Sequence, residues 1–342
     1  MTSSIDLNGK TILVTGGTGS FGQRFLETVL TRYRPHKVIV FSRDELKQME
    51  MSEKKPFRGV SNIRYFIGDV RDADRLEMAF RGVDYVVHAA ALKQVTTAEY
   101  NPFECIRTNV HGAENVVRAA MRAGVNKVIA LSTDKAANPI NLYGASKLAA
   151  DKIFIAARSV VGAGNPNFAV VRYGNVVGSR GSVVPLFRRL IEQGETSLPI
   201  TDPRMTRFWI TLGQGIELVL SALADMHGGE IFVPKIRAMK IVDLARVMAP
   251  NLATHVTGIR PGEKLHELMI TQEDARMTVE LPDRYVVRPS LYADIRKPFS
   301  GEQPVSEDFY YASNNAEWMS DEDFRVMLRD VGVPVPDPGS AG

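Results

Sequence analysis

The sequence predicts an α/β protein, with a doubly wound parallel sheet followed by a smaller C-terminal α/β domain. Short and nearly continuous apolar runs alternate with longer segments of helical period, and this alternation loosens after about residue 175. A glycine-rich turn follows the first apolar run. Runs that lack a two-residue alternation are expected of parallel strands that helices cover on both faces. The sheet should therefore be buried.

The first half of the chain supplies most of the alternation. Strands are expected at 11–16, 37–42, 63–69, 84–90, 127–133 and 168–174. The helices expected between them cover 21–33, 44–55, 73–81, 101–123 and 143–161. Later segments predict helices at 183–193 and 212–226, a strand at 230–235, and short helices near 240–249 and 263–270.

Composition excludes several classes of protein. The chain has 42 lysines and arginines against 39 acidic residues, which gives little reason to expect nucleic acid as a partner. Cys105 is the only cysteine, so an internal disulfide and a thiolate metal cluster are excluded and a cytoplasmic location is favoured. Histidine and methionine spacings predict no catalytic metal. The sequence shows no signal-peptide core, and no apolar stretch approaches the roughly 18 residues of a membrane span.

The stretch "TGGTGSFG" (15–22) lies between the first expected strand and the first helix. Its glycines allow a tight turn, so that free N–H groups at the helix start can meet a pyrophosphate. The alternative is a merely structural turn. The candidate cofactor contacts are Gly16, Thr18, Gly19, Ser20, Phe21 and Gly22.

The glycine turn suggests how the chain is divided. We expect a nucleotide-binding, Rossmann-type domain at 1–175, to which 208–228 returns. Residues 176–207 and 229–290 are expected to form the substrate-binding domain, with a C-terminal extension at 291–342.

The end of the second strand indicates which dinucleotide is bound. An acidic residue usually holds the ribose hydroxyls there, but this chain has Ser42 and Arg43, and an arginine can pair with a 2′-phosphate. NADP is therefore favoured, although Asp44 could serve NAD or simply cap a helix while Arg43 stays a surface charge. Further candidates near the cofactor, or else in sheet packing, are Asp69, Val70, Ala89, Ala90 and Ala91.

Titratable groups follow the fifth expected strand, in "STDKAANPINLYGASK" (132–147). Tyr143 and Lys147 are four residues apart, so on a helix they share one face, and an ammonium group near a phenol lowers the pKa of that phenol. Asp134 and Lys135 stand at the strand end, where the reading from the residues alone favours a solvated charge pair. A Tyr-x-x-x-Lys spacing also occurs by chance in many helices.

The stretches "TGGTGSFG", "LSTDK" and "YGASK" together resemble the extended short-chain dehydrogenase/reductase superfamily. Within it, the chain resembles the inverting UDP-N-acetylglucosamine 4,6-dehydratases of the pseudaminic acid pathway, from about residue 10 to residue 290. Epimerases of the superfamily tend to have small residues where this chain has Asp134 and Lys135, and retaining dehydratases carry Asp-Glu. Membrane-bound relatives often replace the tyrosine with methionine, whereas this chain keeps Tyr143.

The resemblance implies a role for each catalytic group. Tyr143 takes the proton of the C4 hydroxyl while hydride passes to NADP. Lys135, as a neutral amine, removes the C5 proton, and Asp134, kept protonated, donates to the departing C6 hydroxyl. Thr133 is expected to bind the sugar or the phenol, or only to end the strand. Hydride returns to C6, so the cofactor is recycled.

The same resemblance implies a site for the UDP-sugar. Its candidate residues are Lys93, Asn175, Arg180, Ser182, Arg207, Arg260 and Glu263, with Arg204 as a competitor of Arg207. Relatives commonly read Lys-His-Val-Pro where this chain reads "KQVT", so Gln94 and Thr96 lie in the expected sugar loop. Each of these charges alone would more often be a surface charge.

Two other functions remain open: a nucleotide-sugar 4-epimerase, and an NADP-binding regulator without catalysis. The apolar-rich helices expected at 101–123 and 143–161 are the pair that superfamily members commonly bury between subunits. A homo-oligomer is therefore expected, and the resemblance implies a hexamer.

Overall fold

A ten-stranded sheet forms the centre of the protein. The computed structural model describes residues 4–162, 164–179, 181–289 and 298–335. The strand order is β16-β14-β15-β10-β6-β5-β4-β1-β2-β3, and its middle part has the 3-2-1-4-5-6 order of doubly wound folds. The parallel strands are β1 (Thr11–Thr15), β2 (Lys37–Ser42), β3 (Ile63–Ile67), β4 (Tyr85–His88), β5 (Lys127–Thr133), β6 (Asn167–Tyr173) and β10 (Ile231–Pro234). The antiparallel edge comprises β14 (Thr278–Glu280), β15 (Arg284–Val287) and β16 (Gln303–Pro304).

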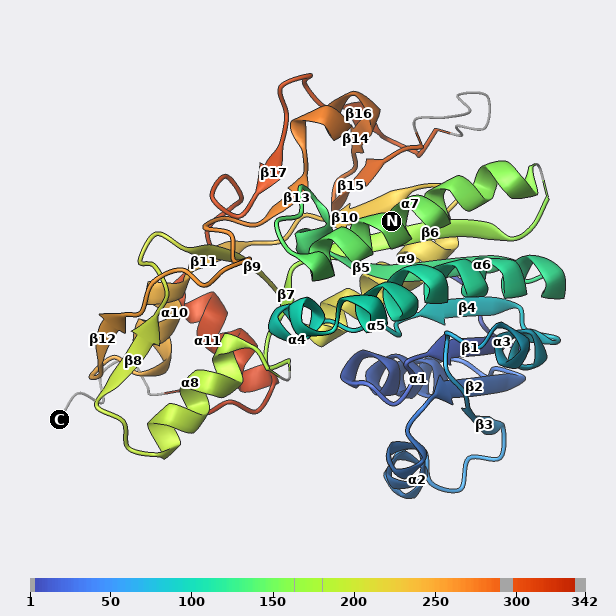
Figure 1. Cartoon of the computed structure of the whole chain (residues 1–342), viewed down its shortest axis with the longest axis horizontal. Helices are drawn as coiled ribbons and strands as arrows, with labels where there is room; N and C mark the ends of the chain where they lie inside the picture. Colours follow the sequence, from blue (N-terminus) through green and yellow to red (C-terminus); the bar gives the residue numbers. More distant parts are fainter. Residues whose placement is uncertain (1–3, 163, 180, 290–297, 336–342) are drawn as a thin grey trace.

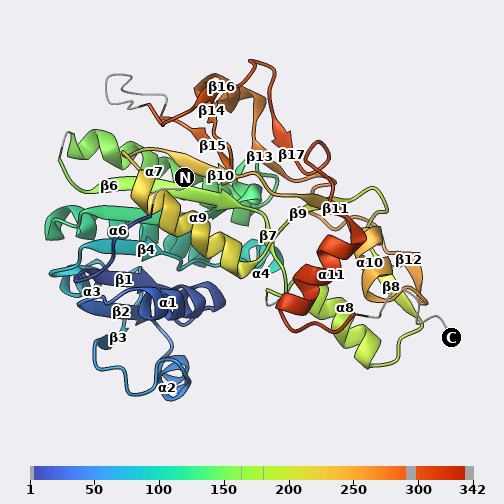
Figure 2. The same ribbon diagram turned by 180° about the vertical axis from the view of Figure 1, so that it is seen from behind.

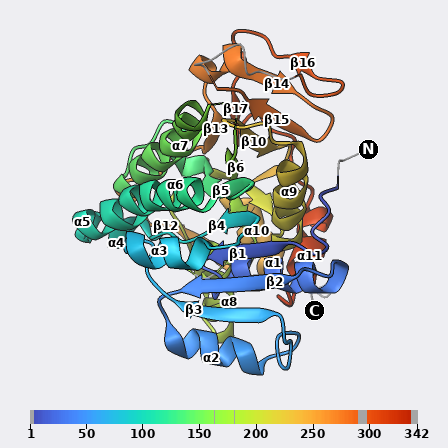
Figure 3. The same ribbon diagram turned by 90° about the vertical axis from the view of Figure 1, so that its right-hand side faces the viewer.

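Helices cover both faces of this sheet (Figures 1 and 2). Figure 3 shows one layer on one side, made of α3 (Ala73–Phe80), α6 (Gly112–Ala123) and α7 (Leu142–Val161). The layer on the other side contains α1 (Ser20–Arg32) and α9 (Leu212–Asp225), while α2 (Glu45–Glu53) follows β2. Leu13 belongs to one hydrophobic core and its neighbours Ile12 and Val14 to the other. The predicted fold class, with its sheet buried on both faces, is confirmed.

A smaller α/β region continues from the carboxyl edge of the large sheet (Figure 1). Trp209, Phe187 and Phe324 are fully buried in its separate core. Its strands are β7 (Asn175–Val176), β9 (Thr206–Ile210) and β11 (Ala238–Lys240) in one sheet, and β8 (Ser197–Ile200) and β12 (Ala253–Val256) in another. Its helices are α8 (Val183–Glu192), α10 (Ile241–Met248) and α11 (Asp321–Asp330).

The structure differs from the expected elements in two segments. The single helix expected at 101–123 is divided into α5 (Pro102–Ile106), a π-helical turn η1 (Arg107–His111) and α6, and it is preceded by α4 (Val95–Tyr100). The short helix expected near 263–270 is wrong. That segment ends in strand β13 (Leu268–Ile270), followed by the 3₁₀ helix η3 (Gln272–Met277).

The strand at 268–270 forms because it has a distant partner. It pairs antiparallel with β17 (Tyr311–Ala312), about 40 residues further along the chain, so no local pattern reveals it. The large sheet also contains β10, β14 and β15, which lie within the 229–290 segment expected to belong to the substrate-binding domain. Among the helices described, none combines the length and apolar character needed to cross a membrane.

Candidate active site

The glycine turn packs tightly between β1, β4 and α1. Gly16 has φ +67°, and a Cβ there would lie 2.9 Å from the backbone nitrogen of Ala90. A Cβ on Gly22 would lie 2.5 Å from Cα of Gly17, so these positions exclude larger residues. Gly19 is the N-cap of α1 and provides no side-chain cap for the helix N–H groups. Thr18 is buried, Phe21 and Ala89 half-buried, and Ser20 and Ala91 exposed.

The end of β2 presents an exposed arginine, Arg43. Ser42 is buried, and its hydroxyl accepts a hydrogen bond from Nε2 of Gln48 at 3.0 Å. Asp44 caps α2 by accepting the N–H of Lys47 and also pairs with the ammonium group of Lys47, whereas the exposed Arg43 points to Asp69. Arg43 lies 3.5 Å from the carboxylate of Asp69.

Asp69 and Val70 lie in the loop after β3. Burial raises the pKa of Asp69, but hydrogen bonds and charge from Arg71, with the charge of Arg43, lower it overall. Val70 is buried and leaves no room for a Cβ on Gly112 of α6. These contacts therefore favour the carboxylate form of Asp69 beside Arg43.

The 3₁₀ turn η2 (Asp134–Ala136) places two charged side chains directly after β5. Asp134 is fully buried, and its Oδ1 accepts hydrogen bonds from Oγ1 of Thr133 at 2.9 Å and Nζ of Lys135 at 3.0 Å. Nζ of Lys135 also lies 3.3 Å from Oε1 of Glu267 and 3.5 Å from Oδ1 of Asn175. Asp134 and Lys135 are thus not a solvated surface pair.

Tyr143 and Lys147 lie in the first turns of α7, beside η2. Asn141 caps this helix by accepting the N–H of Gly144 at 2.7 Å. The two segments touch at Gly144, since a Cβ there would lie only 2.3 Å from the carbonyl oxygen of Lys135. Nζ of Lys147 donates to the carbonyl oxygen of Leu131 at 2.7 Å. The structure therefore brings Thr133, Asp134, Lys135, Tyr143 and Lys147 to one edge of the sheet.

Burial dominates the titration of Tyr143. It raises the pKa of this phenol to about 12, against opposing effects from the charge of Lys135 and a hydrogen bond with Thr133. The cation that favours the phenolate is thus Lys135, where the sequence suggested Lys147. Burial lowers the pKa of Lys147, and the charge of Asp151 opposes that effect.

Lys135 and Asp134 titrate against each other. Burial alone lowers the pKa of Lys135, but the carboxylates of Asp134 and Glu267 raise it overall. Burial raises the pKa of Asp134, and the charge of Lys135 opposes this effect. The two carboxylates therefore favour the ammonium form of Lys135, whereas the expected role as a base requires the neutral amine.

Glu267 is the site residue that the sequence reasoning did not include. It is 2% exposed, and its Oε1 also lies 3.6 Å from Nε of Arg207. It ends the stretch "GIRPGEKLHE", which carries part of the resemblance, but the helix expected there gave no reason to direct this carboxylate toward Lys135. Lys264 of the same stretch donates to the carbonyl oxygen of Ala137 at 2.6 Å.

The remaining candidate residues differ in their burial and in their partners. Arg207 is buried within the cluster around Lys135, whereas Arg204 is exposed and paired with Asp202, so the structure favours Arg207 for an internal role. Arg260 and Glu263 pair with each other at 3.0 Å. The loop that carries them is held to α7, since Nδ2 of Asn141 donates to the carbonyl oxygen of Gly262 at 2.8 Å.

The loop after β4 and the loop before α8 approach each other. Lys93, Gln94 and Thr96 are exposed, and a Cβ on Gly181 would lie 2.6 Å from Nε2 of Gln94. Ser182 is the N-cap residue of α8, but its hydroxyl donates to the carbonyl oxygen of Ser179. Arg180 lies outside the described residues. Within the described ranges, no three His, Cys, Asp or Glu side chains gather as a metal site would require.

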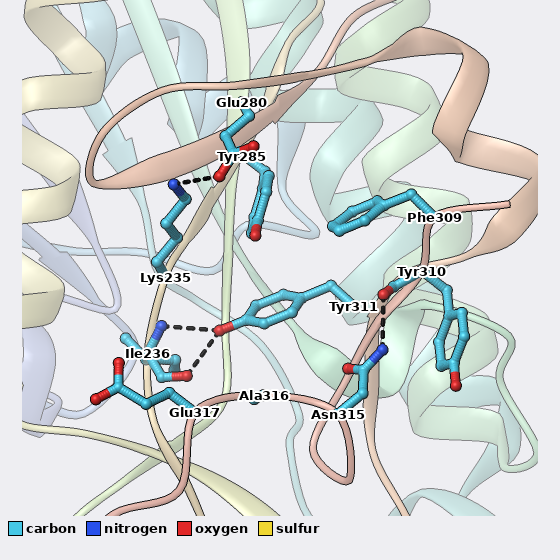
Figure 4. A pocket seen from close by; sticks show the side chains of 10 residues that line it. All are labelled: Lys235, Ile236, Glu280, Tyr285, Phe309, Tyr310, Tyr311, Asn315, Ala316 and Glu317. Atoms are coloured by element: carbon cyan, nitrogen blue, oxygen red, sulfur yellow. Dashed lines mark hydrogen bonds and ion pairs between the residues drawn. The ribbon is translucent and has the colours of Figure 1, made fainter. Parts of the chain in front are cut away.

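A separate pocket of about 310 Å³ lies at the antiparallel edge of the large sheet (Figure 4). Lys235 and Glu280 form an ion pair on one side of it. The Tyr311 hydroxyl accepts from the backbone nitrogen of Ile236 and donates to its carbonyl oxygen. None of the catalytic candidates lines this pocket, so its hollow is distinct from the cluster around Lys135.

The doubly wound sheet, the glycine turn and the Tyr-x-x-x-Lys helix define a protein of the short-chain dehydrogenase/reductase class. The family model described as "Polysaccharide biosynthesis protein" matches residues 12–289, and the chain belongs to that family.

Two curated relatives and one solved structure illustrate its similarities. The chain is 56% identical to "UDP-N-acetylglucosamine 4,6-dehydratase (inverting)" of Campylobacter jejuni, over 94% of this chain and 98% of the relative. It is 42% identical to "UDP-glucose 4-epimerase" of Rickettsia conorii, over 93% and 95%. The structure of DesIV, a dTDP-glucose 4,6-dehydratase from Streptomyces venezuelae with NAD and TYD bound, superimposes with a TM-score of 0.64 at 25% identity, covering 75% and 86%.

Proposed function

We propose that this protein catalyses the NADP-dependent 4,6-dehydration of UDP-N-acetylglucosamine with inversion at C5. The observation that carries the proposal is the ion pair between the buried Asp134 and the half-buried Lys135, adjacent to Tyr143 at the sheet edge. The product is UDP-2-acetamido-2,6-dideoxy-β-L-arabino-hexos-4-ulose, which we assign to cytoplasmic synthesis of pseudaminic acid and surface glycans. The 56% identity to a relative named for this reaction supports the assignment.

The residues of the glycine turn fit a dinucleotide. Gly16 and Gly22 leave no space for side chains, so the chain can pass close to a pyrophosphate at the start of α1. Arg43 would hold the 2′-phosphate of NADP, and Tyr143 and Lys147 the nicotinamide ribose. The bound nicotinamide supplies a hydride acceptor that returns the hydride later in the same turnover. The NAD named with DesIV supports a nicotinamide cofactor, and Arg43 supports the choice of NADP.

We assign the first proton transfer, which accompanies oxidation at C4, to Tyr143. Its phenolate accepts the proton of the C4 hydroxyl as hydride leaves C4. The nearby Lys135 charge and Thr133 hydroxyl favour the phenolate, and burial opposes it. The resulting 4-ketone acidifies the hydrogen at C5.

We assign the next proton transfers, which eliminate water, to Lys135 and Asp134. Their polar atoms are 3.0 Å apart, so one proton passing from Nζ to Oδ1 creates an amine and a carboxylic acid. The amine then takes the C5 proton, and Asp134 gives its proton to the departing C6 hydroxyl, which leaves as water. The hydride removed from C4 would be delivered to C6, and a proton drawn from solvent would be added to C5 on the opposite face. The reaction thus removes one water without net oxidation.

The charge around Lys135 suits an anionic substrate. Arg207 and Lys264 add two cations close to the pair of carboxylates. We assign the diphosphate to Arg207, with Arg180, Arg260, Ser182 and Asn175 as further contacts. Glu263 is assigned to a ribose hydroxyl and Lys93 to the sugar.

The test is the mass of the product. Incubation with UDP-N-acetylglucosamine and NADP should remove one water, and in D₂O it should place deuterium at C5. NMR coupling constants of the 4-keto product then report its configuration at C5. An unchanged mass with a new sugar would instead identify a 4-epimerase, the activity named for the relative at 42% identity. NADP binding without turnover would indicate a regulator.

We also propose that the protein is a homo-oligomer, with the hexamer as the expected form. Tyr100 and Phe103 are 83% and 79% exposed, next to the layer formed by α6 and α7. Large apolar side chains exposed together commonly mark an interface. Light scattering at micromolar concentration tests this, and a monomer would contradict it.

A further inference from the structure

Glu267 connects the C-terminal part of the chain with the catalytic turn. Its Oε1 lies 3.3 Å from Nζ of Lys135 and 3.6 Å from Nε of Arg207. The backbone of Glu267 is fixed by Ser313: its N–H donates to Oγ of Ser313 at 2.9 Å, and the N–H of Ser313 donates back at 2.8 Å. A carboxylate this deeply buried is stable only when paired, so its position is well defined.

The surroundings of Nζ fit an ammonium group. Three acceptors surround it, from Asp134 at 3.0 Å, Glu267 at 3.3 Å and Asn175 at 3.5 Å. An ammonium group has three N–H donors and can satisfy all three acceptors, whereas a neutral amine has two. Glu267 therefore both orients Lys135 and favours its charged form.

We propose that Glu267 is a positioning residue that holds the ammonium group of Lys135 at the catalytic turn and thereby controls when Lys135 can act as a base. The catalytic consequence rests on the proposed function. The contact itself does not, since it is present in the protein without substrate.

The charges that face Lys135 determine the direction of the effect. Asp134 from η2 and Glu267 before β13 favour the ammonium group, whereas Arg207 of β9 and Lys264 oppose it. Tyr143 of α7 faces it as a neutral phenol. Replacing Glu267 by glutamine removes one of two stabilising charges, so Lys135 should lose its proton at lower pH.

Competitive acetylation measures this loss directly. Acetic anhydride is reacted with the full chain without substrate between pH 7 and 10, and mass spectrometry compares Lys135 with Lys152, an exposed lysine of α7. Glu267→Gln should increase the relative labelling of Lys135 about tenfold, the effect of one pKa unit. Glu267→Asp keeps the charge and should restore low labelling. Glu280→Gln breaks only the ion pair with Lys235 (Figure 4) and should change nothing.

The pH dependence of turnover provides the catalytic arm. In Glu267→Gln, the rising limb of kcat should move by about one unit to lower pH. Unchanged labelling and an unchanged limb in a folded variant would overturn the proposal. If Glu267→Gln loses its circular dichroism signal, Ser313→Ala serves as the second variant, because it loosens the same carboxylate. Ser313→Ala should increase the labelling of Lys135 severalfold, and labelling that does not increase would also overturn the proposal. A wild-type protein that labels as expected but releases no water would overturn only the proposed function.

Discussion

Replacing Gly144 by alanine tests the contact that places Tyr143 beside Lys135. The new Cβ would lie 2.3 Å from the carbonyl oxygen of Lys135 and 3.0 Å from Cβ of Pro139. An ordinary contact begins at 3.4 Å, so η2 and α7 must separate by about 1 Å. Catalytic groups must be held within about 0.5 Å, and a displacement of about 1 Å can cost roughly 10²-fold in rate. We expect Gly144→Ala to lower turnover about 100-fold and to destabilise the fold by about 1–3 kcal/mol through overpacking.

Gly215 supplies the matched control for this substitution. It also lies in a helix, α9, but a Cβ there meets nothing within 4 Å. Gly215→Ala should leave turnover unchanged and stabilise the protein by about 0.5–1 kcal/mol, since alanine is the better helix former. Product mass gives turnover, and urea unfolding gives stability. Wild-type turnover in Gly144→Ala, or equal behaviour of the two variants, would refute the reasoning.

Three further substitutions test separate parts of the site. Tyr143→Phe should lower turnover at least about 10²-fold, whereas NADP binding, followed by fluorescence, should weaken by no more than about tenfold for the one lost hydrogen bond; comparable turnover would remove its role as base. Arg43→Ala should weaken NADP binding about tenfold and leave NAD binding unchanged, and an equal loss for both would contradict the 2′-phosphate assignment. His88→Gln concerns stability: burial and the charge of Lys147 lower the pKa of His88 from 6.5 to about 3. Between these two pKa values only the unfolded chain binds the proton, so each pH unit of acidification lowers the free energy of unfolding by about 1.4 kcal/mol. Urea titrations at pH 4 to 6 should show that His88→Gln lacks this pH dependence.

Local patterns predicted the parts of the site that are close in sequence. The turn at Gly16 to Gly22 and the spacing of Tyr143 and Lys147 are readable because strand, turn and helix follow one another directly. The apolar runs likewise predicted the fold class, since burial on both faces leaves a continuous signal.

Contacts between distant segments could not be predicted in this way. Strand β13 depends on β17, and Glu267 reaches Lys135 across 132 positions of sequence, so neither follows from periodicity. The same contact favours the ammonium form of Lys135, and the family resemblance does not reveal it. The residues alone likewise favour a surface charge at Asp134, because one sequence does not show that its turn is covered.

The Ser313–Glu267 hydrogen bonds have a consequence for synthesis of the chain. Lys135 has left the ribosome long before residue 313 is made, so the nascent protein carries the catalytic turn without its second carboxylate. Full assembly of this turn therefore waits until Glu267 and Ser313 have both been translated. Substitutions around Ser313 should therefore disturb the surroundings of Lys135, 178 positions earlier in the sequence.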